Sequence, residues 1–142
     1  MSTKTLNLDK VAAEHAQAMV EKTGSVKDVK KHIETFERLV TKALGVLQQQ
    51  GVYALMLFLF SRTSDEDRIA KKCVLPCLFS VLRLLPSFED SEGVPEEETG
   101  VQEALKFYSD RVTAHLDTLL LVRDLYEQTL IYARYHAKAA GG

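Results

Sequence analysis

The two cysteines, Cys73 and Cys77, are the side chains best suited to nucleophilic or redox chemistry in this 142-residue chain. Their four-residue spacing, in a segment with a helical pattern, places them one turn apart on the same helix face. Their neighbours include Val74, Leu75 and Leu78, whereas a reactive thiol needs an exposed, electropositive environment. We therefore expect both cysteines to pack in the core, and not to serve as a nucleophile or a disulfide framework.

Histidines and glycines form no recognisable catalytic or metal-binding motif. The histidines are scattered over different segments, at His15, His32, His115 and His136. A structural zinc site needs four ligands, often in two close pairs, and no second pair accompanies the cysteines. The glycines are isolated, so the sequence lacks a glycine-rich phosphate loop. We expect no enzymatic activity, no bound metal and no cofactor.

Basic residues are a stronger indication of a binding surface. Four of them follow one helical stripe, at spacings of four, seven and four: Lys27, Lys31, Arg38 and Lys42. Others surround the turn that comes next, namely Arg62, Arg68, Lys71 and Lys72. Two interpretations stay open from the residues alone: a solvated face that forms ion pairs with Glu34 and Glu37, or a ridge that contacts a phosphate backbone.

The distribution of charge allows contact with a phosphate backbone without requiring it. The whole chain carries a formal charge of −2, from 18 basic and 20 acidic residues. Six of the acids lie between Pro86 and Gly100, where there is no Lys or Arg, so the rest of the chain has 18 basic and 14 acidic residues, a net charge of +4. A free-standing nucleic-acid binder usually shows a much stronger basic stripe.

Apolar residues at three- and four-residue spacing predict the helices that must position these side chains. We expect helices over about 9–23, 29–50, 52–62 and 65–85. A further helical stretch runs from Val101 almost to the end, either as one helix or, as we favour, as two helices separated near Asp117. Ser25 with Asp28, and Ser64 with the acids after it, are predicted helix starts. Gly51 is expected in a left-handed conformation, and Pro76 predicts a kink or break near residues 72–75.

The sequence therefore predicts an all-α fold, a single-domain bundle of about five to six helices over residues 1–142. The acidic run at about 86–100 has the composition of a solvated or mobile loop, and residues 139–142 are expected to fray. Residues 52–62 are apolar on nearly every side, so this helix should be central or covered by a partner. With neither a signal-peptide pattern nor a long apolar run, we expect a cytoplasmic protein that does not enter a membrane.

A family resemblance covers the 24 residues from Leu39 to Arg62, Leu-Val-Thr-Lys-Ala-Leu-Gly-Val-Leu-Gln-Gln-Gln-Gly-Val-Tyr-Ala-Leu-Met-Leu-Phe-Leu-Phe-Ser-Arg. This segment resembles the central motif of the fifth Cmr protein family, the small helical subunit of type III-B CRISPR effector complexes. The matching positions are Val40, Lys42, Gly51, Phe58, Leu59 and Ser61, with Arg62 in place of Lys. The departures are Thr41 for Lys, Leu44 for Pro and Gln50 for Asn. Residues 126–139 are similar to the closing helix of the family, with Tyr132 where a Trp is expected.

The resemblance implies a non-catalytic subunit that stacks along the effector with copies of itself and other subunits. It also implies contact between basic residues and RNA, in the region of the guide–target duplex, weak for the isolated subunit. Only Lys42 and Arg62 carry over by motif position, and helical spacing extends the candidate set to Lys31, Arg38, Lys71 and Lys72. The alternative is a helical adaptor that binds only protein, with residues 55–60 as its docking surface.

Overall fold

The computed structural model describes residues 7–24, 29–88 and 93–140, apart from the side chains of residues 29–31. Within these residues the regular structure is entirely helical, as predicted. The α-helices are α1 (Leu8–Gly24), α2 (Val29–Gln50), α3 (Val52–Phe60), α4 (Ser64–Ile69), α5 (Leu75–Leu82), α6 (Val101–Phe107) and α7 (Leu116–Ala139). Two π-helical turns, η1 (Ala70–Val74) and η3 (Tyr108–Thr113), and the 3₁₀ turn η2 (Pro86–Phe88) complete them.

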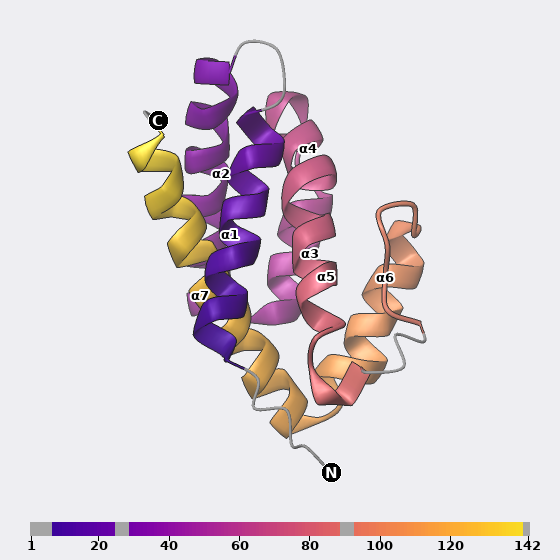
Figure 1. Cartoon of the computed structure of the whole chain (residues 1–142). Helices are drawn as coiled ribbons and strands as arrows, with labels where there is room; N and C mark the ends of the chain where they lie inside the picture. The colour runs from indigo at the N-terminus through magenta and orange to yellow at the C-terminus, as the bar shows by residue number, and fades with distance from the viewer. Residues whose placement is uncertain (1–6, 25–28, 89–92, 141–142) are drawn as a thin grey trace.

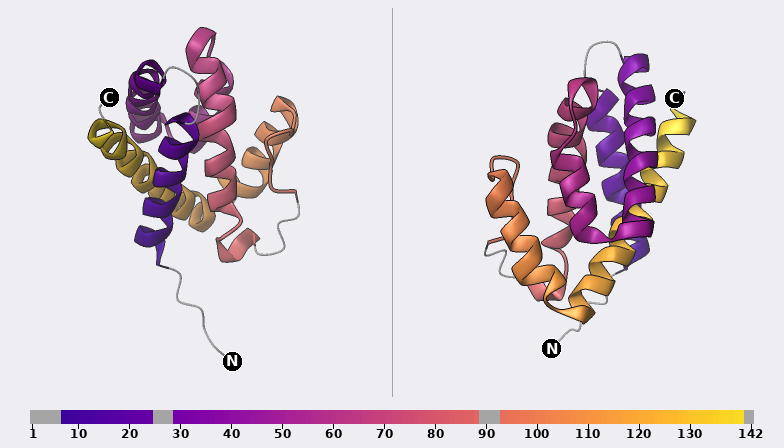
Figure 2. Two further views of the ribbon diagram at one scale, coloured as in Figure 1. Left: turned by 45° about the horizontal axis from the view of Figure 1, so that its top comes forward. Right: turned by 180° about the vertical axis from the view of Figure 1, so that it is seen from behind.

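These elements join into six continuous helical segments of the described chain, because η1 links α4 to α5 and η3 extends α6. Figure 1 shows α1 at the front, with α2 and α7 on one side of it and the α4–η1–α5 segment on the other. α1 packs against α7, α2 and α5, and α3 lies behind the α4–η1–α5 segment. The α6–η3 segment stands at the edge of the bundle and reaches it through α3 and α7 (Figure 2).

Amphipathic spacing explains why the helices pack in this way. On α2, Phe36, Val40, Ala43 and Leu47 recur at four- and three-residue intervals and are fully buried. On α3, Leu55, Met56 and Leu59 are buried while Leu57 is exposed. The apolar helix predicted at 52–62 is thus central, but it also presents two large side chains, Tyr53 and Leu57, to the surface.

Gly51 makes the sharp reversal between α2 and α3. Its φ is 98° and its ψ is −173°. The positive φ was predicted, but this ψ lies far from the left-handed helical value, in a region open essentially only to glycine. A Cβ atom at Gly51 would meet no atom within 4 Å. The requirement for glycine therefore comes from the backbone alone.

Pro76 interrupts the α4–η1–α5 segment through a change of helix type. The residues before it form the π-helical turn η1, and Pro76 itself lies in the first turn of α5. A proline there gives up no α-helical hydrogen bond, because the first amide groups of an α-helix lack partners within it. The predicted interruption is confirmed, and the wider turn accommodates the ring without ending the helix.

Two other boundaries test the sequence predictions. The final helical stretch is two helices, separated at Ala114 and His115, as favoured. The helix start at Ser64 was wrong in detail: the N-cap residue is Thr63, and neither side chain caps α4 by a hydrogen bond. The start predicted at Ser25 and Asp28 lies outside the described residues. α7 ends at Ala139, and residues 141–142 of the predicted frayed end are likewise not described.

The acidic run is better anchored than its composition predicts. Phe88, Val94 and Pro95 are buried, so the described residues on both sides of 89–92 contribute to the core. Arg83 donates a hydrogen bond to the carbonyl oxygen of Pro95 over 2.9 Å and lies 3.8 Å from Glu96. The prediction of a solvated loop is therefore wrong for Phe88 and for residues 94–95, and residues 89–92 are not described.

Polar contacts help to tie α7 to the rest of the bundle. At its middle, the hydroxyl groups of Tyr108 and Tyr126 are both buried and lie 2.6 Å apart, and Tyr126 donates to the carbonyl oxygen of Leu78 over 3.1 Å. Nearer the surface, the Asp9 carboxylate of α1 accepts hydrogen bonds from Tyr132 and Gln128. These bonds lower the pKa of Asp9. Tyr132 thus holds α1 against α7.

Candidate nucleic-acid interface

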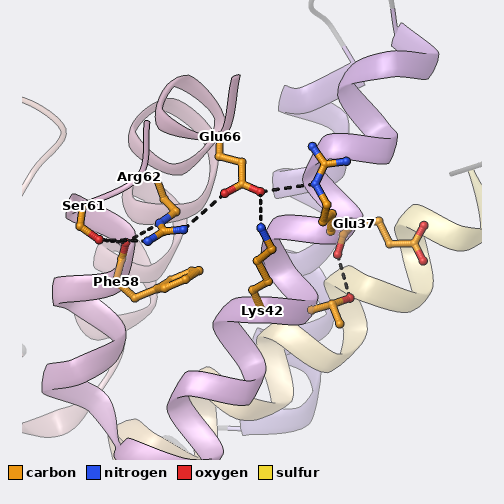
Figure 3. Close-up of polar contacts among 8 residues, drawn as sticks. Glu37, Lys42, Phe58, Ser61, Arg62 and Glu66 are labelled. Atoms are coloured by element: carbon orange, nitrogen blue, oxygen red, sulfur yellow. Dashed lines mark hydrogen bonds and ion pairs between the residues drawn. The ribbon is translucent and has the colours of Figure 1, made fainter. Parts of the chain in front are cut away.

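Three of the predicted RNA-contacting residues converge on one carboxylate, that of Glu66. Lys42 Nζ lies 3.0 Å from Glu66 Oε2, and Arg38 Nε lies 3.4 Å from the same oxygen. Arg62 reaches the other oxygen, Oε1, over 3.5 Å. Figure 3 shows Lys42 and Arg62 each reaching a different oxygen of the Glu66 carboxylate. We call Arg38, Lys42, Arg62 and Glu66 the basic cluster; it joins α2, the end of α3 and the start of α4.

Arg62 is held in place by the end of α3 as well as by Glu66. Its Nε donates to the carbonyl oxygen of Phe58 over 2.9 Å, and its NH2 group donates to Ser61 Oγ over 3.2 Å. The guanidinium carbon lies 3.9 Å from the centre of the Phe58 ring, a cation–π contact. The last carbonyl groups of a helix lack partners within it, so Arg62 caps α3 through its side chain.

The basic cluster keeps an excess of positive charge at the surface. Three cations surround one anion, so its net charge is +2 if all four groups are ionised. The side chains of Arg38, Lys42 and Arg62 are 57%, 47% and 25% exposed, whereas that of Glu66 is 13% exposed. Burial acts to raise the pKa of Glu66, but the charges and hydrogen bonds of Lys42, Arg38 and Arg62 outweigh it and lower the pKa. Glu66 is therefore ionised at neutral pH.

The other predicted residues lie elsewhere or outside the description. Lys71 is paired with Asp67, and Lys72 lies 3.7 Å from Glu97 of the acidic run. Lys71 also lines a hollow formed with Phe60, Phe79, Glu97 and residues 99–101. Both lysines thus have partners other than Glu66, and the structure does not gather the predicted set onto one site. The side chain of Lys31 lies outside the described residues.

Glu66 is the member of the basic cluster that the sequence reasoning missed. The acids at 65–67 were interpreted only as a favourable charge at the start of a helix. The four-residue spacing between Arg62 and Glu66 was a signal for their ion pair, but the approach of Arg38 and Lys42 depends on how α2 packs against α4. Glu37, one of the two acids in the ion-pair interpretation of this face, pairs with Lys138 of α7, 3.9 Å away.

Both cysteines lie in the core, as predicted, at relative exposures of 4% for Cys73 and 9% for Cys77. Burial raises the pKa of the Cys77 thiol to about 11, the reverse of the shift that activates a nucleophile. Among residues 7–24, 32–88 and 93–140, no three His, Cys, Asp or Glu side chains are arranged to hold a metal ion. In the same part of the chain, no helix has the length and apolar character needed to span a membrane.

Comparison with known proteins adds no relationship: no family model matches the chain, and no curated protein or solved structure is similar to it.

Proposed function

We propose that this protein is a non-catalytic structural subunit of a type III-B CRISPR ribonucleoprotein that targets RNA. It stacks along the filament and contacts the target RNA backbone through the basic cluster. The observation that supports this proposal is the convergence of Lys42 and Arg62. These are the two basic positions of the family-like motif, 20 residues apart in the chain, and both contact Glu66.

The chemistry of the basic cluster suits a phosphate group. Lys42 supplies a compact point charge, and the Arg38 and Arg62 guanidinium groups supply planar sets of donors that can bind two oxygens at once. Such contacts are independent of base sequence and weaken as salt rises. A subunit that follows any target strand requires contacts that do not depend on base sequence.

Purification of the tagged protein from its native cells tests its place in the assembly. The proposal expects recovery together with several larger repeat-associated subunits and a guide RNA. Identification of the bound proteins by mass spectrometry, and of the RNA by sequencing, gives the answer. Recovery of the protein alone, or with partners that carry no RNA, would overturn the proposal and favour the protein-only adaptor.

Replacing Lys42 and Arg62 together by Gln should weaken binding to single-stranded RNA. Loss of two phosphate contacts should reduce the slope of log affinity against log salt by about 1.4, since each contact to a single strand contributes about 0.7. Fluorescence anisotropy over a salt series measures this slope. The matched control is Lys10→Gln with Lys106→Gln, which removes two exposed charges from α1 and α6. An equal loss in both double variants would mean that only net charge matters.

Glu66→Gln should change RNA affinity in the opposite direction, because Glu66 competes with phosphate for the three cations. We expect an increase of about tenfold or less at low salt, which shrinks as salt screens the site. The thermal midpoint should fall slightly, since partly exposed ion pairs each contribute only about 0.2–1 kcal/mol. Asp67→Asn is the control, because Asp67 is paired with Lys71 instead. Unchanged or weaker RNA binding by Glu66→Gln would contradict the role of the basic cluster.

A further inference from the structure

A shallow groove of about 440 Å³ runs between α2 and α3 beside the basic cluster. Its lining residues are Val46 and Gln50 of α2 and Ala54, Leu57, Phe58 and Ser61 after the reversal at Gly51. Apolar side chains make up the middle, while Gln50 and Ser61 supply polar groups. We call this the α2–α3 groove. It holds Leu57, an exposed apolar residue of α3.

The α2–α3 groove and the basic cluster are continuous. On α2, Lys42 precedes Val46 by one turn, so the two side chains lie on the same helix face. On α3, Phe58 and Ser61 line the groove, and both contact the Arg62 side chain. Figure 3 shows the Phe58 ring directed from α3 toward α2, on the side where Lys42 lies. An apolar groove with an aromatic wall therefore opens directly onto positive charge.

We infer that the α2–α3 groove binds one unpaired RNA base while the basic cluster binds an adjacent phosphate. This inference rests on the proposed function and extends it from the backbone of the strand to a base. Single-stranded nucleic acid is commonly held by positive charge beside an aromatic side chain on which a base stacks. Phe58 supplies that ring and Arg62 covers part of it, while the Gln50 amide can hydrogen-bond a base edge.

Charge favours a nucleotide over an apolar peptide as the occupant. A protein segment seated in the α2–α3 groove would have to cover or neutralise a net charge of +2 at its end. A nucleotide carries a flat base and a negative phosphate on one short unit. The base matches the apolar groove, and the phosphate matches the positive charge of the adjacent basic cluster. Guide–target pairing would have to release the base, so the groove should select unpaired nucleotides.

Three probes of equal length separate base binding from phosphate binding: an oligouridylate strand, an abasic ribose–phosphate strand, and an oligouridylate–oligoadenylate duplex. Oligouridylate should bind between about fivefold and about a hundredfold more tightly than the abasic strand, the range that stacking of one base gives. Ala54→Leu, which fills the groove, should reduce the affinity for oligouridylate and leave that for the abasic strand unchanged.

Leu57→Ala removes a groove wall and should have the same selective effect. Its matched control is Leu120→Ala on α7, since Leu57 and Leu120 are 47% and 49% exposed. Thermal midpoints show whether each variant is folded, and sedimentation shows its oligomeric state. Lys42→Gln with Arg62→Gln should weaken binding of both single strands, because that pair acts on phosphate.

The outcomes distinguish failure of this inference from failure of the proposed function. Equal affinity for the uridylate and abasic strands, with sensitivity to Lys42 and Arg62 retained, would overturn base binding alone. Binding that is insensitive to Lys42 and Arg62, or absent for every probe, would overturn both. Groove variants that change the oligomeric state without changing the preference for uridylate would assign the α2–α3 groove to a protein partner, and base binding would again be wrong.

Discussion

Tyr126→Phe should lower the free energy of unfolding by about 1–3 kcal/mol, the cost of leaving a buried polar group without a partner. Tyr126 has one hydroxyl proton and donates it to the Leu78 carbonyl oxygen, so Tyr108 must donate to Tyr126. Without the Tyr126 oxygen, the fully buried Tyr108 hydroxyl loses its acceptor. Tyr108→Phe should cost less, about 1 kcal/mol, because Tyr126 keeps its bond to Leu78.

The double variant tests this directional arrangement. Removing both hydroxyl groups leaves neither tyrosine oxygen buried without a partner, so Tyr108→Phe with Tyr126→Phe should be more stable than Tyr126→Phe alone. Urea unfolding of the two single variants and the double variant measures the order. Equal effects of the two single changes, or a double variant whose loss is their sum, would contradict the relay from Tyr108 through Tyr126 to Leu78.

Gly51→Ala should lower the free energy of unfolding by about 1–3 kcal/mol, the cost of holding a side chain in a strained backbone conformation. The backbone at Gly51 requires φ 98° and ψ −173°, where an alanine is strained even though nothing obstructs its Cβ atom. Gly51→Asn should give no rescue, because asparagine tolerates the left-handed helical region and not this one. Loss of the reversal would also separate Lys42 from Arg62 and weaken RNA binding.

Gly45→Ala is the matched control for this prediction. Gly45 lies inside α2, and its added Cβ would likewise meet no atom within 4 Å. Alanine is favoured over glycine within a helix, so this change should stabilise the protein by about 0.5–1 kcal/mol. Thermal unfolding of the two variants should therefore shift in opposite directions. A stabilised Gly51→Ala variant would show that the reversal does not need glycine.

The helices could be predicted from the sequence because their apolar faces repeat with a helical period. The spacing of Phe36, Val40 and Leu47 on α2 is a local property, and burial on the bundle side follows from it. Pro76 and Gly51 also correctly indicated where the helical pattern is interrupted. The backbone conformations at these interruptions could not be predicted, because neither the π-helical turn η1 nor the ψ of Gly51 has a distinctive residue pattern of its own.

The candidate site was predictable only in part, because local sequence patterns do not determine which helices pack side by side. Lys42 and Arg62 were chosen by motif, and Arg38 by its helical spacing. Their shared partner Glu66 follows from α2 packing beside α4, which no local pattern encodes. Lys71 and Lys72 are basic residues like Lys42, yet their partners are Asp67 and Glu97. The α2–α3 groove was missed because its walls come from two helices.

The ion pairs that Glu66 makes with three cations have a consequence for how a row of subunits would recognise a strand. If the proposed function holds, phosphate would have to displace an internal carboxylate, so each single contact would be weak and would exchange rapidly. Copies fixed side by side would bind one strand together, and their affinities would combine through effective concentration. Occupancy would then depend steeply on the number of adjacent subunits engaged. Such an array would respond to the length of the strand: short fragments would dissociate, and a long target would be retained.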